Sequence, residues 1–311
     1  MNEKNITIGA DIGGGHILSA AIDTRKGEII EDSRAYVKVN NKASKTEILK
    51  TWAEALNTTI GKIDASRLAG IGFAMPGPFD YKTGMALFEG NDKYEALYKV
   101  SIKEELPSFL AAPGIALRFL NDATSFAVGV SWLGEAKGYN KVIAVTLGTG
   151  FGSAYVEDGA PVVQREDVPE QGCFWHLPYE DGIVDDYFST RWFIREYEKL
   201  SGQKVKGVKE IAEAAENSEA AKGLFRTFGH NMGAFFVPWL KLFPADILVM
   251  GGNVTHAFNL FGEAMQAVFL ENDIRTRIAI SSLMEDAALI GSARLFEESF
   301  WNKIKDKLPS I

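Results

Sequence analysis

Two glycine-rich turns of the same form constrain this 311-residue chain more than any other feature. The first occupies residues 11–15 and follows a short apolar run, and the second occupies residues 146–150 and follows another. A further apolar run returns after each turn, which predicts a strand, a tight turn and an antiparallel return strand, occurring twice. We therefore expect two related halves that each offer backbone N–H groups to an anion, and the expected ligand is a nucleoside triphosphate.

The size and charge of the chain narrow the classes of function. A chain of 311 residues exceeds what one hydrophobic core usually serves, so we expect two domains. Acidic residues outnumber basic ones by 41 to 33 without a long basic run, so nucleic acid is not an expected partner. A single cysteine excludes an internal disulfide and is typical of a reducing compartment. No segment resembles a signal peptide or a membrane span, so we expect a cytoplasmic protein without membrane contact.

Hydrophobic spacing predicts alternating strands and helices, which is typical of an α/β fold. Helices are expected over 45–60 and from 121 to about 133, and mainly helical regions over 187–243 and 287–307. Buried strands are expected over 68–74, 115–120 and 247–250. The expected boundary lies near residue 119. It divides the chain into a small domain, 1–118 plus 290–311, and a larger domain, 119–289.

The first turn lacks the common nucleotide-binding fingerprints. The chain has no G-x-x-x-x-G-K-[ST] sequence, and its triple glycine leads into a strand, whereas a dinucleotide-binding turn leads into a helix. A triple glycine between strands can be an ordinary hairpin. Asp11 favours a phosphate site, because a carboxylate beside a phosphate is repulsive unless Mg²⁺ lies between them. The candidate phosphate-binding residues are Gly13, Gly14 and Gly15 in the first turn and Gly148, Thr149, Gly150 and Gly152 in the second.

Five motifs occur in the order of a known family. They are Asp11-Ile-Gly-Gly, Pro76-Gly77-Pro78-x-Asp80, Asn121-Asp122-Ala123, Leu147-Gly148-Thr149-Gly150-x-Gly152 and Gly251-Gly252. This set resembles the sugar kinases of the ROK family, within the actin/hexokinase-like ATPase superfamily, over roughly residues 6–295. The resemblance implies two related α/β domains of the ribonuclease H-like type, with the active site in the cleft between them. It also implies phosphorylation of a six-carbon sugar by ATP.

Asp122 is the expected catalytic residue. A sugar hydroxyl loses its proton as it attacks the γ-phosphorus, so a kinase needs a carboxylate within hydrogen-bond reach of that hydroxyl. An acid at the start of a helix can instead be only an N-cap. Asn121 would hydrogen-bond a neighbouring hydroxyl. Positioning, Mg²⁺ and backbone N–H groups should contribute more to the rate than the base itself.

The resemblance also implies further contacts with ATP, Mg²⁺ and the sugar, which rest on less specific motifs. Asp11 would hold Mg²⁺ through water, and Gly251 and Gly252 would join the two turns in binding ATP. Gly77 and Asn91 would approach the sugar, although a turn asparagine in a polar loop explains Asn91 equally well. Between residues 170 and 189 the sugar-binding candidates are Glu170, Cys173, His176 and Asp185.

The chain departs from the family pattern in two places. Similar kinases carry a histidine and three cysteines that bind a structural zinc, whereas this chain has one cysteine and four histidines, so we expect no zinc site. Cys173 falls on the position of the family histidine, or His176 does after a three-residue slip, and either side chain can simply be packed in a loop. Gly15 stands where the family usually has threonine, which removes one phosphate contact and predicts slow turnover.

Two functions from different classes remain open at this stage. The leading hypothesis is an ATP-dependent kinase for the 6-hydroxyl of glucose or of an N-acetylated amino sugar such as N-acetylglucosamine or N-acetylmannosamine. The alternative is a catalytically weakened sugar-binding protein with a sensory or regulatory role. A DNA-binding repressor is disfavoured, because only five residues precede the first expected strand. The family also implies a homodimer or a homotetramer.

Overall fold

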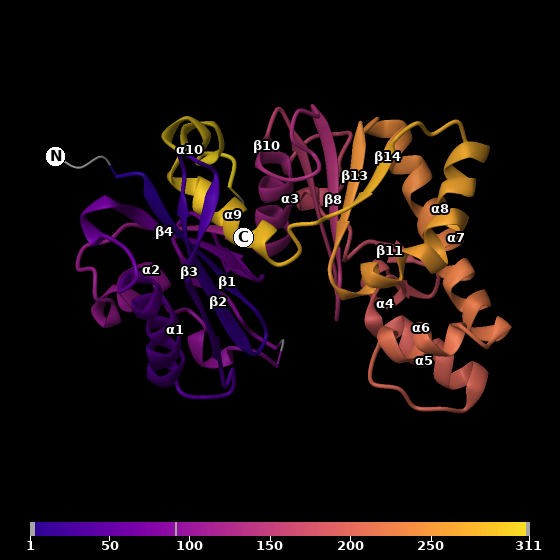
Figure 1. Ribbon diagram of the computed structural model, residues 1–311, viewed down its shortest axis with the longest axis horizontal. Helices are drawn as coiled ribbons and strands as arrows, with labels where there is room; N and C mark the ends of the chain where they lie inside the picture. Colours follow the sequence, from indigo (N-terminus) through magenta and orange to yellow (C-terminus); the bar gives the residue numbers. More distant parts are fainter. Residues whose placement is uncertain (1–3, 91, 309–311) are drawn as a thin grey trace. The chain divides into compact units, whose positions relative to one another are not determined.

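The computed structural model describes residues 4–90 and 92–308 (Figure 1). It contains two compact units, unit 1 (Met1–Gly134 and Glu285–Ile311) and unit 2 (Glu135–Met284). The division falls later than the boundary expected near residue 119, because the strand and the helix on either side of that position both pack within unit 1. The chain therefore completes the first sheet and the helices over 45–60 and 122–132 before it enters unit 2.

Unit 1 is built on a five-stranded sheet with the order β3-β2-β1-β4-β7. The first three strands form an antiparallel meander, and β4 and β7 run parallel to β1. The strands are β1 (Ile6–Ile12), β2 (His16–Asp23), β3 (Glu28–Lys38), β4 (Leu68–Met75) and β7 (Leu117–Asn121), with a separate hairpin of β5 (Phe79–Asp80) and β6 (Met85–Ala86).

Unit 2 repeats this topology with the strand order β10-β9-β8-β13-β14. Again a meander surrounds a glycine turn, and two parallel strands follow on the other side of its first strand. The strands are β8 (Lys141–Leu147), β9 (Phe151–Glu157), β10 (Ala160–Val162), β13 (Ile247–Gly251) and β14 (Arg277–Ile280), with a separate hairpin of β11 (Pro178–Tyr179) and β12 (Gly182–Ile183). The prediction of two related halves is confirmed.

The helices between residues 45 and 60, 122 and 132, 190 and 242, and 286 and 304 lie in the regions expected to be helical. Those of unit 1 are α1 (Lys45–Ile60), α2 (Ile102–Glu105), α3 (Asp122–Trp132), α9 (Asp286–Ala293) and α10 (Glu298–Ile304). Those of unit 2 are α4 (Val184–Tyr187), α5 (Thr190–Ser201), α6 (Val208–Ala215), α7 (Glu219–Leu242) and α8 (Phe258–Glu271). Short 3₁₀ helices span Ala65–Arg67, Glu95–Leu97, Leu106–Phe109, Glu170–Gly172, Asn253–Ala257 and Arg294–Phe296. Across 4–90 and 92–308, every helix is too short or too polar to cross a membrane.

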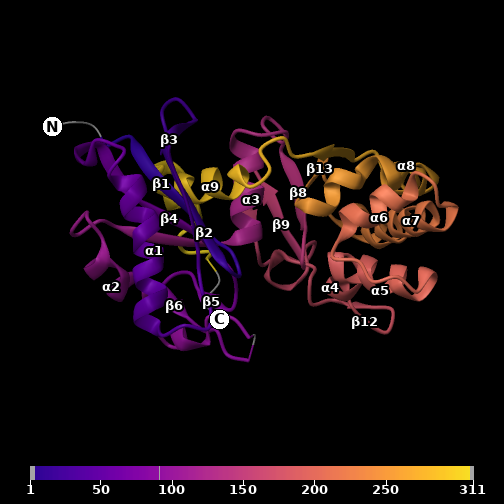
Figure 2. The same cartoon turned by 60° about the horizontal axis from the view of Figure 1, so that its bottom comes forward.

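Helices cover both faces of the unit 1 sheet. Figure 2 shows α1 and α9 on opposite sides of this sheet. The Ser19 hydroxyl lies 3.3 Å from the Ala55 carbonyl oxygen of α1, and Gly9 lies against α9. Neighbouring residues of a strand point to opposite faces, and the cross-strand pairs Gly9–Ala20 and Ala10–Ser19 therefore mark the two sides. Asp11 has the same orientation as Gly9, so it lies on the face that α9 covers.

Backbone contacts between glycines and α9 bring the two parts of unit 1 together. A Cβ built on Gly9 of β1 would lie 2.1 Å from the Leu289 carbonyl oxygen, and one on Gly72 of β4 would lie 1.9 Å from that of Ser292. A Cβ on Gly129 of α3 would lie 1.9 Å from the carbonyl oxygen of Ala287. These separations are far below van der Waals contact, so α9 can approach the sheet and α3 this closely only because no side chain intervenes.

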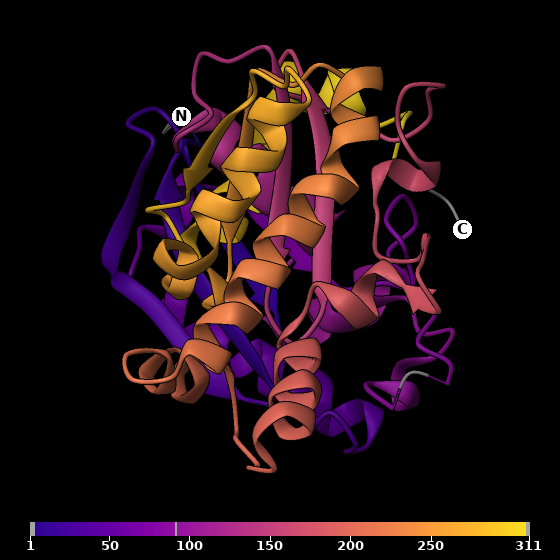
Figure 3. The ribbon, with the colours of Figure 1, turned by 90° about the vertical axis from the view of Figure 1, so that its right-hand side faces the viewer.

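Aromatic side chains fill much of the unit 2 core. In Figure 3 α7 and α8 lie side by side, and the carbonyl oxygen of Phe261 would lie 2.1 Å from a Cβ on Gly229. The Phe228 ring lies 4.5 Å from that of Phe193 and 5.2 Å from that of Phe261, measured between ring centroids. Buried phenylalanines thus join α5, α7 and α8 into one layer on the sheet.

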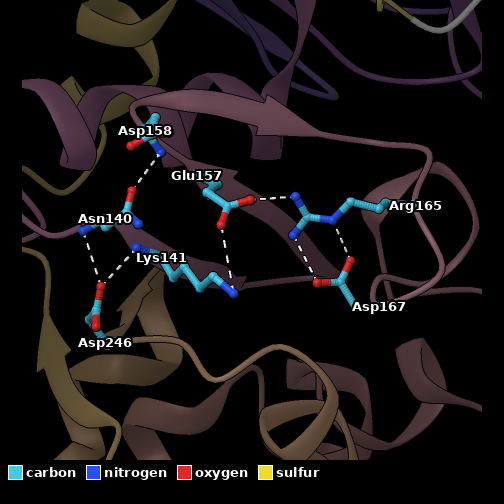
Figure 4. Close-up of polar contacts among 7 residues, drawn as sticks. All are labelled: Asn140, Lys141, Glu157, Asp158, Arg165, Asp167 and Asp246. Atoms are coloured by element: carbon cyan, nitrogen blue, oxygen red, sulfur yellow. Dashed lines mark hydrogen bonds and ion pairs between the residues drawn. The ribbon is translucent and has the colours of Figure 1, made fainter.

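A polar network holds the end of the unit 2 sheet that lies away from its glycine turn (Figure 4). The Asp246 carboxylate accepts hydrogen bonds from the backbone N–H groups of Asn140 and Lys141, at 3.1 and 2.8 Å. Arg165 pairs with Glu157 at the end of β9 and with Asp167, and these contacts tie the loop after β10 to the sheet. The network holds the strand ends and this loop in place, so its role is structural.

The glycine contacts predict opposite effects of the same substitution in two helices. Gly129→Ala should lower the free energy of unfolding by about 3 kcal/mol, because the new methyl group would overlap the Ala287 backbone. Gly223→Ala in α7, where a Cβ would meet nothing within 4 Å, should raise it by about 0.5–1 kcal/mol through helix propensity. Urea denaturation of the two variants measures both effects, and similar changes in the two would contradict the close packing of α3 on α9.

Candidate active site

The candidate residues of unit 1 meet at one edge of its sheet. Because β1, β4 and β7 are parallel neighbours, their carboxyl ends lie at the same edge, where ligands bind in α/β folds. Asp11 pairs with Ala74 in this register, and Met75 pairs with Asn121. Asp11, the loop that contains Gly77, and Asp122 are therefore brought together, although they are far apart in the sequence.

Asn121 and Asp122 have different roles at the start of α3, since Asn121 caps the helix and Asp122 is its first residue. The side-chain oxygen of Asn121 accepts a hydrogen bond from the Thr124 N–H at 3.1 Å, so Asn121 is the N-cap. Its side-chain NH₂ group donates to Asp122 at 2.9 Å and to the hydroxyl of Tyr81 at 3.3 Å. Asp122 is therefore free of the capping role. The contact of Asn121 with a sugar hydroxyl stays a prediction, because its amide already has protein partners.

Two carboxylates at this edge have raised pKa values. Burial, reinforced by the charges of Asp122 and Glu285, raises the pKa of Asp11 to about 7. Burial also raises the pKa of Asp122, although hydrogen bonds to its carboxylate and the charge of Lys93 act in the opposite direction. Partly buried acids with raised pKa values do not stabilise the fold. A group of them is therefore typical of a functional site.

Hydrogen bonds fix the first glycine turn, mainly through the carbonyl oxygens of Gly13 and Gly14. The Gly13 N–H donates to the His16 carbonyl oxygen at 2.9 Å, and the Tyr94 hydroxyl donates to the Gly13 carbonyl oxygen at 2.7 Å. The Asn41 side chain donates to the carbonyl oxygen of Gly14. Among the described residues, the Gly14 N–H has no protein acceptor, so it can donate to an anion.

The three glycines of this turn have different surroundings. A Cβ on Gly13 would lie 2.4 Å from the His16 ring, and one on Gly14 would lie 3.2 Å from the Lys93 ammonium nitrogen. A Cβ on Gly15 would meet only the Val39 carbonyl oxygen, at 4.0 Å. Side chains thus cover Gly13 and Gly14, whereas position 15 has room for the threonine that is usual in the family.

In unit 2 the second glycine turn lies beside another glycine pair. The Gly148 N–H donates to the Gly150 carbonyl oxygen at 3.0 Å, which closes the turn between β8 and β9. Gly252 has a positive φ of 86°, and a Cβ there would lie 2.5 Å from the Leu147 carbonyl oxygen. Thr149 is exposed at the tip of the turn. The structure therefore joins the candidate ATP-binding residues of this unit, Gly148, Thr149, Gly150, Gly251 and Gly252, at one sheet edge, whereas Gly152 lies within β9, paired with Thr146.

Asp185 contacts the second turn. Its carboxylate accepts a hydrogen bond from the Phe151 N–H at 2.6 Å and pairs with Arg191. A Cβ on Gly150 would lie 2.8 Å from the same carboxylate, so this glycine leaves the space that Asp185 occupies. Both carboxylate oxygens thus have protein partners, and the predicted contact of Asp185 with a sugar stays a prediction.

Cys173 and His176 lie side by side. The Cys173 sulfur is 3.8 Å from His176 Nδ1 and 3.8 Å from the carbonyl oxygen of Glu170. Burial raises the pKa of the Cys173 thiol to about 11, so the thiol stays protonated near neutral pH. Over 4–90 and 92–308, no three His, Cys, Asp or Glu side chains are grouped to hold a metal ion. The absence of zinc stays a prediction from the cysteine count.

The Asp11 carboxylate and the Gly14 N–H, both in unit 1, fit Mg²⁺ and a phosphate group. Carboxylate oxygens suit Mg²⁺, which keeps several water ligands, and Asp11 lies in the negative potential of Asp122 and Glu285. Lys93 and Glu285 were not singled out from the sequence. The available signal for Lys93 was its position two residues after Asn91, a predicted sugar contact. Asn91, in the same loop, lies outside the described residues.

Removal of the Asp11 charge should change how stability depends on pH. The unfolded chain loses this proton near the ordinary value of 3.8, whereas the folded state holds it up to about pH 7. The folded state therefore binds more protons between these values, and the contribution of Asp11 to stability falls as the pH rises through that window.

Relative to the wild type, Asp11→Asn should gain free energy of unfolding from pH 4 to pH 7 and remain level above pH 7. Urea denaturation at several pH values measures this difference. The exposed Asp273→Asn variant is the control and should show no such gain. A constant difference between Asp11→Asn and the wild type would contradict the raised pKa.

Comparisons with known proteins identify the family. The model of the ROK family matches residues 7–299. The glucokinase of Thermotoga maritima is 25% identical over 320 residues, which cover 94% of this chain and 97% of the glucokinase. This match extends over both units.

Solved structures share the fold. A ROK family glucokinase from Streptomyces griseus, solved in complex with glucose and AMPPNP, superposes with a TM-score of 0.73 at 23% identity, covering 94% of this chain and 99% of its own. A ROK family transcriptional regulator, a homologue of the E. coli MLC protein, superposes with a TM-score of 0.78 at 14% identity. The superposition covers 97% of this chain and 80% of the regulator. Kinases and regulators therefore share this architecture. Because the family model spans nearly the whole length, this chain belongs to the ROK family.

Proposed function

We propose that this protein is an ATP-dependent hexose kinase that phosphorylates the 6-hydroxyl of glucose or of an N-acetylated amino sugar. The observation that carries the proposal is the position of Asp122, which starts α3 at the sheet edge shared with Asp11 and the first glycine turn. Family membership and the similarity to a glucokinase support the same activity.

Asp122 would act as the general base. As the sugar oxygen forms its bond to the γ-phosphorus, the bond from this phosphorus to ADP breaks, and the hydroxyl proton moves to the Asp122 carboxylate. Burial raises the pKa of this carboxylate, which strengthens it as a base. The hydrogen bond from Asn121 orients the carboxylate, so Asn121 would assist the reaction through Asp122.

The two glycine turns would bind the phosphates. The N–H of Gly14 in the first turn and that of Thr149 in the second have no acceptor among the described residues. Mg²⁺, held by Asp11 through water, would neutralise phosphate charge and lower the barrier to transfer. These groups are expected to contribute more to the rate than the base does.

The choice of sugar would depend on the segment between residues 160 and 189. The side chain of Ser153 accepts a hydrogen bond from the Phe174 N–H at 2.8 Å, which anchors this segment to β9 beside Cys173 and His176. Glu170, Cys173 and His176 are the proposed sugar-contacting residues there. Following the family, we further propose a cytoplasmic homodimer or homotetramer, which sedimentation of the purified protein would test.

A second candidate function is a sugar-binding protein with a sensory or regulatory role. Gly15 favours it, because this position lacks a hydroxyl although the surrounding space would admit one. The similarity to a ROK regulator adds support. Calorimetry would distinguish the candidates, since tight sugar binding by folded protein without ADP release from ATP with any hexose would favour the second.

Asp122→Asn tests the proposed base. With Mg²⁺, ATP and a panel of hexoses, the wild type should release ADP with at least one sugar, and the variant should lose about 10²- to 10⁴-fold in kcat. Sugar affinity measured by calorimetry should remain, because the asparagine oxygen can still accept from the Asn121 amide and the Ala123 N–H. Unchanged turnover would remove Asp122 from the mechanism.

Gly15→Thr tests whether the missing hydroxyl limits turnover. We expect kcat to rise by about tenfold, the value of one hydrogen bond to a charged group. Gly15→Val is the matched control, because valine has the same shape without the hydroxyl. Equal turnover of the two variants would show that the hydroxyl has no part in the reaction.

A further inference from the structure

Lys93 extends across the first glycine turn. The nitrogen and the ε-carbon of its side chain each lie 3.2 Å from the place that a Cβ on Gly14 would occupy. Its charge also reaches the catalytic candidate Asp122, on which it acts electrostatically. A single ammonium group thus lies beside the phosphate-binding turn, and its charge acts on the proposed base.

The backbone around Lys93 is attached to the same turn. Tyr94 is buried, and its N–H donates to the Asn41 carbonyl oxygen at 2.9 Å while its hydroxyl donates to Gly13 at 2.7 Å. Asn41 in turn donates from its side chain to Gly14. Asp92 and Tyr94 both have left-handed backbone conformations, with φ of 58° and 57°, which are unfavourable for residues other than glycine. The loop is therefore built in one conformation that places Lys93 at the turn.

We propose that Lys93 is a further catalytic residue of the transfer, and that its ammonium group binds the phosphoryl group as it passes from ATP to the sugar. This inference rests on the proposed kinase function. The phosphoryl group must lie within reach of the phosphate-binding turn when it leaves ADP and near the hydroxyl activated by Asp122 when it arrives. Lys93 lies beside the turn, and its charge acts on Asp122.

The charges at this edge favour a phosphate ligand for Lys93. Asp11, Asp122 and Glu285 already create a negative potential, and the γ-phosphate of ATP adds further negative charge. During transfer the P–O bond to ADP breaks and the bond to the sugar oxygen forms, while the three other phosphoryl oxygens remain charged. An ammonium group with three donors stabilises this charge as a point cation.

A neighbouring lysine has a different function. Lys42 lies 3.0 Å from the Asp92 carboxylate and is largely exposed, so it neutralises the acid that precedes Lys93. Lys42 therefore serves as the matched control, since its removal takes away a positive charge beside this loop without changing the group over Gly14.

The experiment compares two nucleotides that differ in the γ-phosphate. Calorimetry with Mg²⁺ measures the affinities of AMPPNP and ADP for the wild type, Lys93→Met, Lys93→Arg and Lys42→Met. Lys93→Met should weaken AMPPNP binding about tenfold and leave ADP binding within about twofold, because only AMPPNP carries the γ-phosphate. Its kcat/KM should fall about 10²-fold, which is typical when a transition-state donor is lost. Lys93→Arg should recover part of the AMPPNP affinity and part of kcat/KM. Lys42→Met should have the affinities and the kcat/KM of the wild type.

Equal loss of AMPPNP and ADP affinity in Lys93→Met, or no loss of either affinity or turnover, would overturn the inference. The inference would also be overturned if Lys42→Met lost as much AMPPNP affinity and kcat/KM as Lys93→Met. Thermal unfolding of each variant checks that it is folded, and Lys93→Arg provides the comparison if methionine disturbs the loop.

The result separates this inference from the proposed function. A wild type that turns over while Lys93→Met does so equally well refutes only the role of Lys93. A wild type that binds AMPPNP through Lys93 but phosphorylates no sugar refutes only the kinase function. A wild type that binds neither nucleotide counts against both.

Discussion

The close contact between the α9 backbone and three glycines is the interaction on which unit 1 depends. Gly9, Gly72 and Gly129 leave room for carbonyl oxygens of α9, so a segment near the C-terminus packs directly on β1, β4 and α3. The contact positions α3, whose first residue is Asp122, and it places Glu285, at the start of α9, near Asp11. The geometry of the candidate site in this unit therefore depends on packing that involves none of its own side chains.

The electrostatics of that site follow from the same packing. Acidic groups from the end of β1 and from the starts of α3 and α9 gather at one sheet edge, and burial raises the pKa values of Asp11 and Asp122. Such a group of acids lowers stability unless cations neutralise it. Lys93 is one cation within the chain, and MgATP would bring another. The cost in stability of these buried acids is thus tied to the proposed binding of a cationic ligand.

The sequence predicted the elements better than their grouping. The helix over 45–60 and the strand over 247–250 followed from apolar spacing, and α1 begins at a Ser44–Glu47 capping box that is visible in the sequence. The unit boundary differed from the expected position near residue 119, since β7 and α3 join unit 1 through contacts with β4 and α9. The same limit applies to the site, because the proximity of Lys93 to Gly14 and of Asp185 to Phe151 joins residues that lie far apart in the sequence and share no periodic pattern.

The sequence by itself determined the two glycine turns, the strands beside them, the family and the choice of Asp11 and Asp122 as candidates. These features are local, because a turn requires particular residues at adjacent positions and a motif keeps its spacing along the chain. The tertiary structure alone shows that Gly15 has free space, that Asp185 contacts the second turn and that Lys93 covers the first. Each of these depends on distances between residues that packing brings together, and no local pattern encodes such distances.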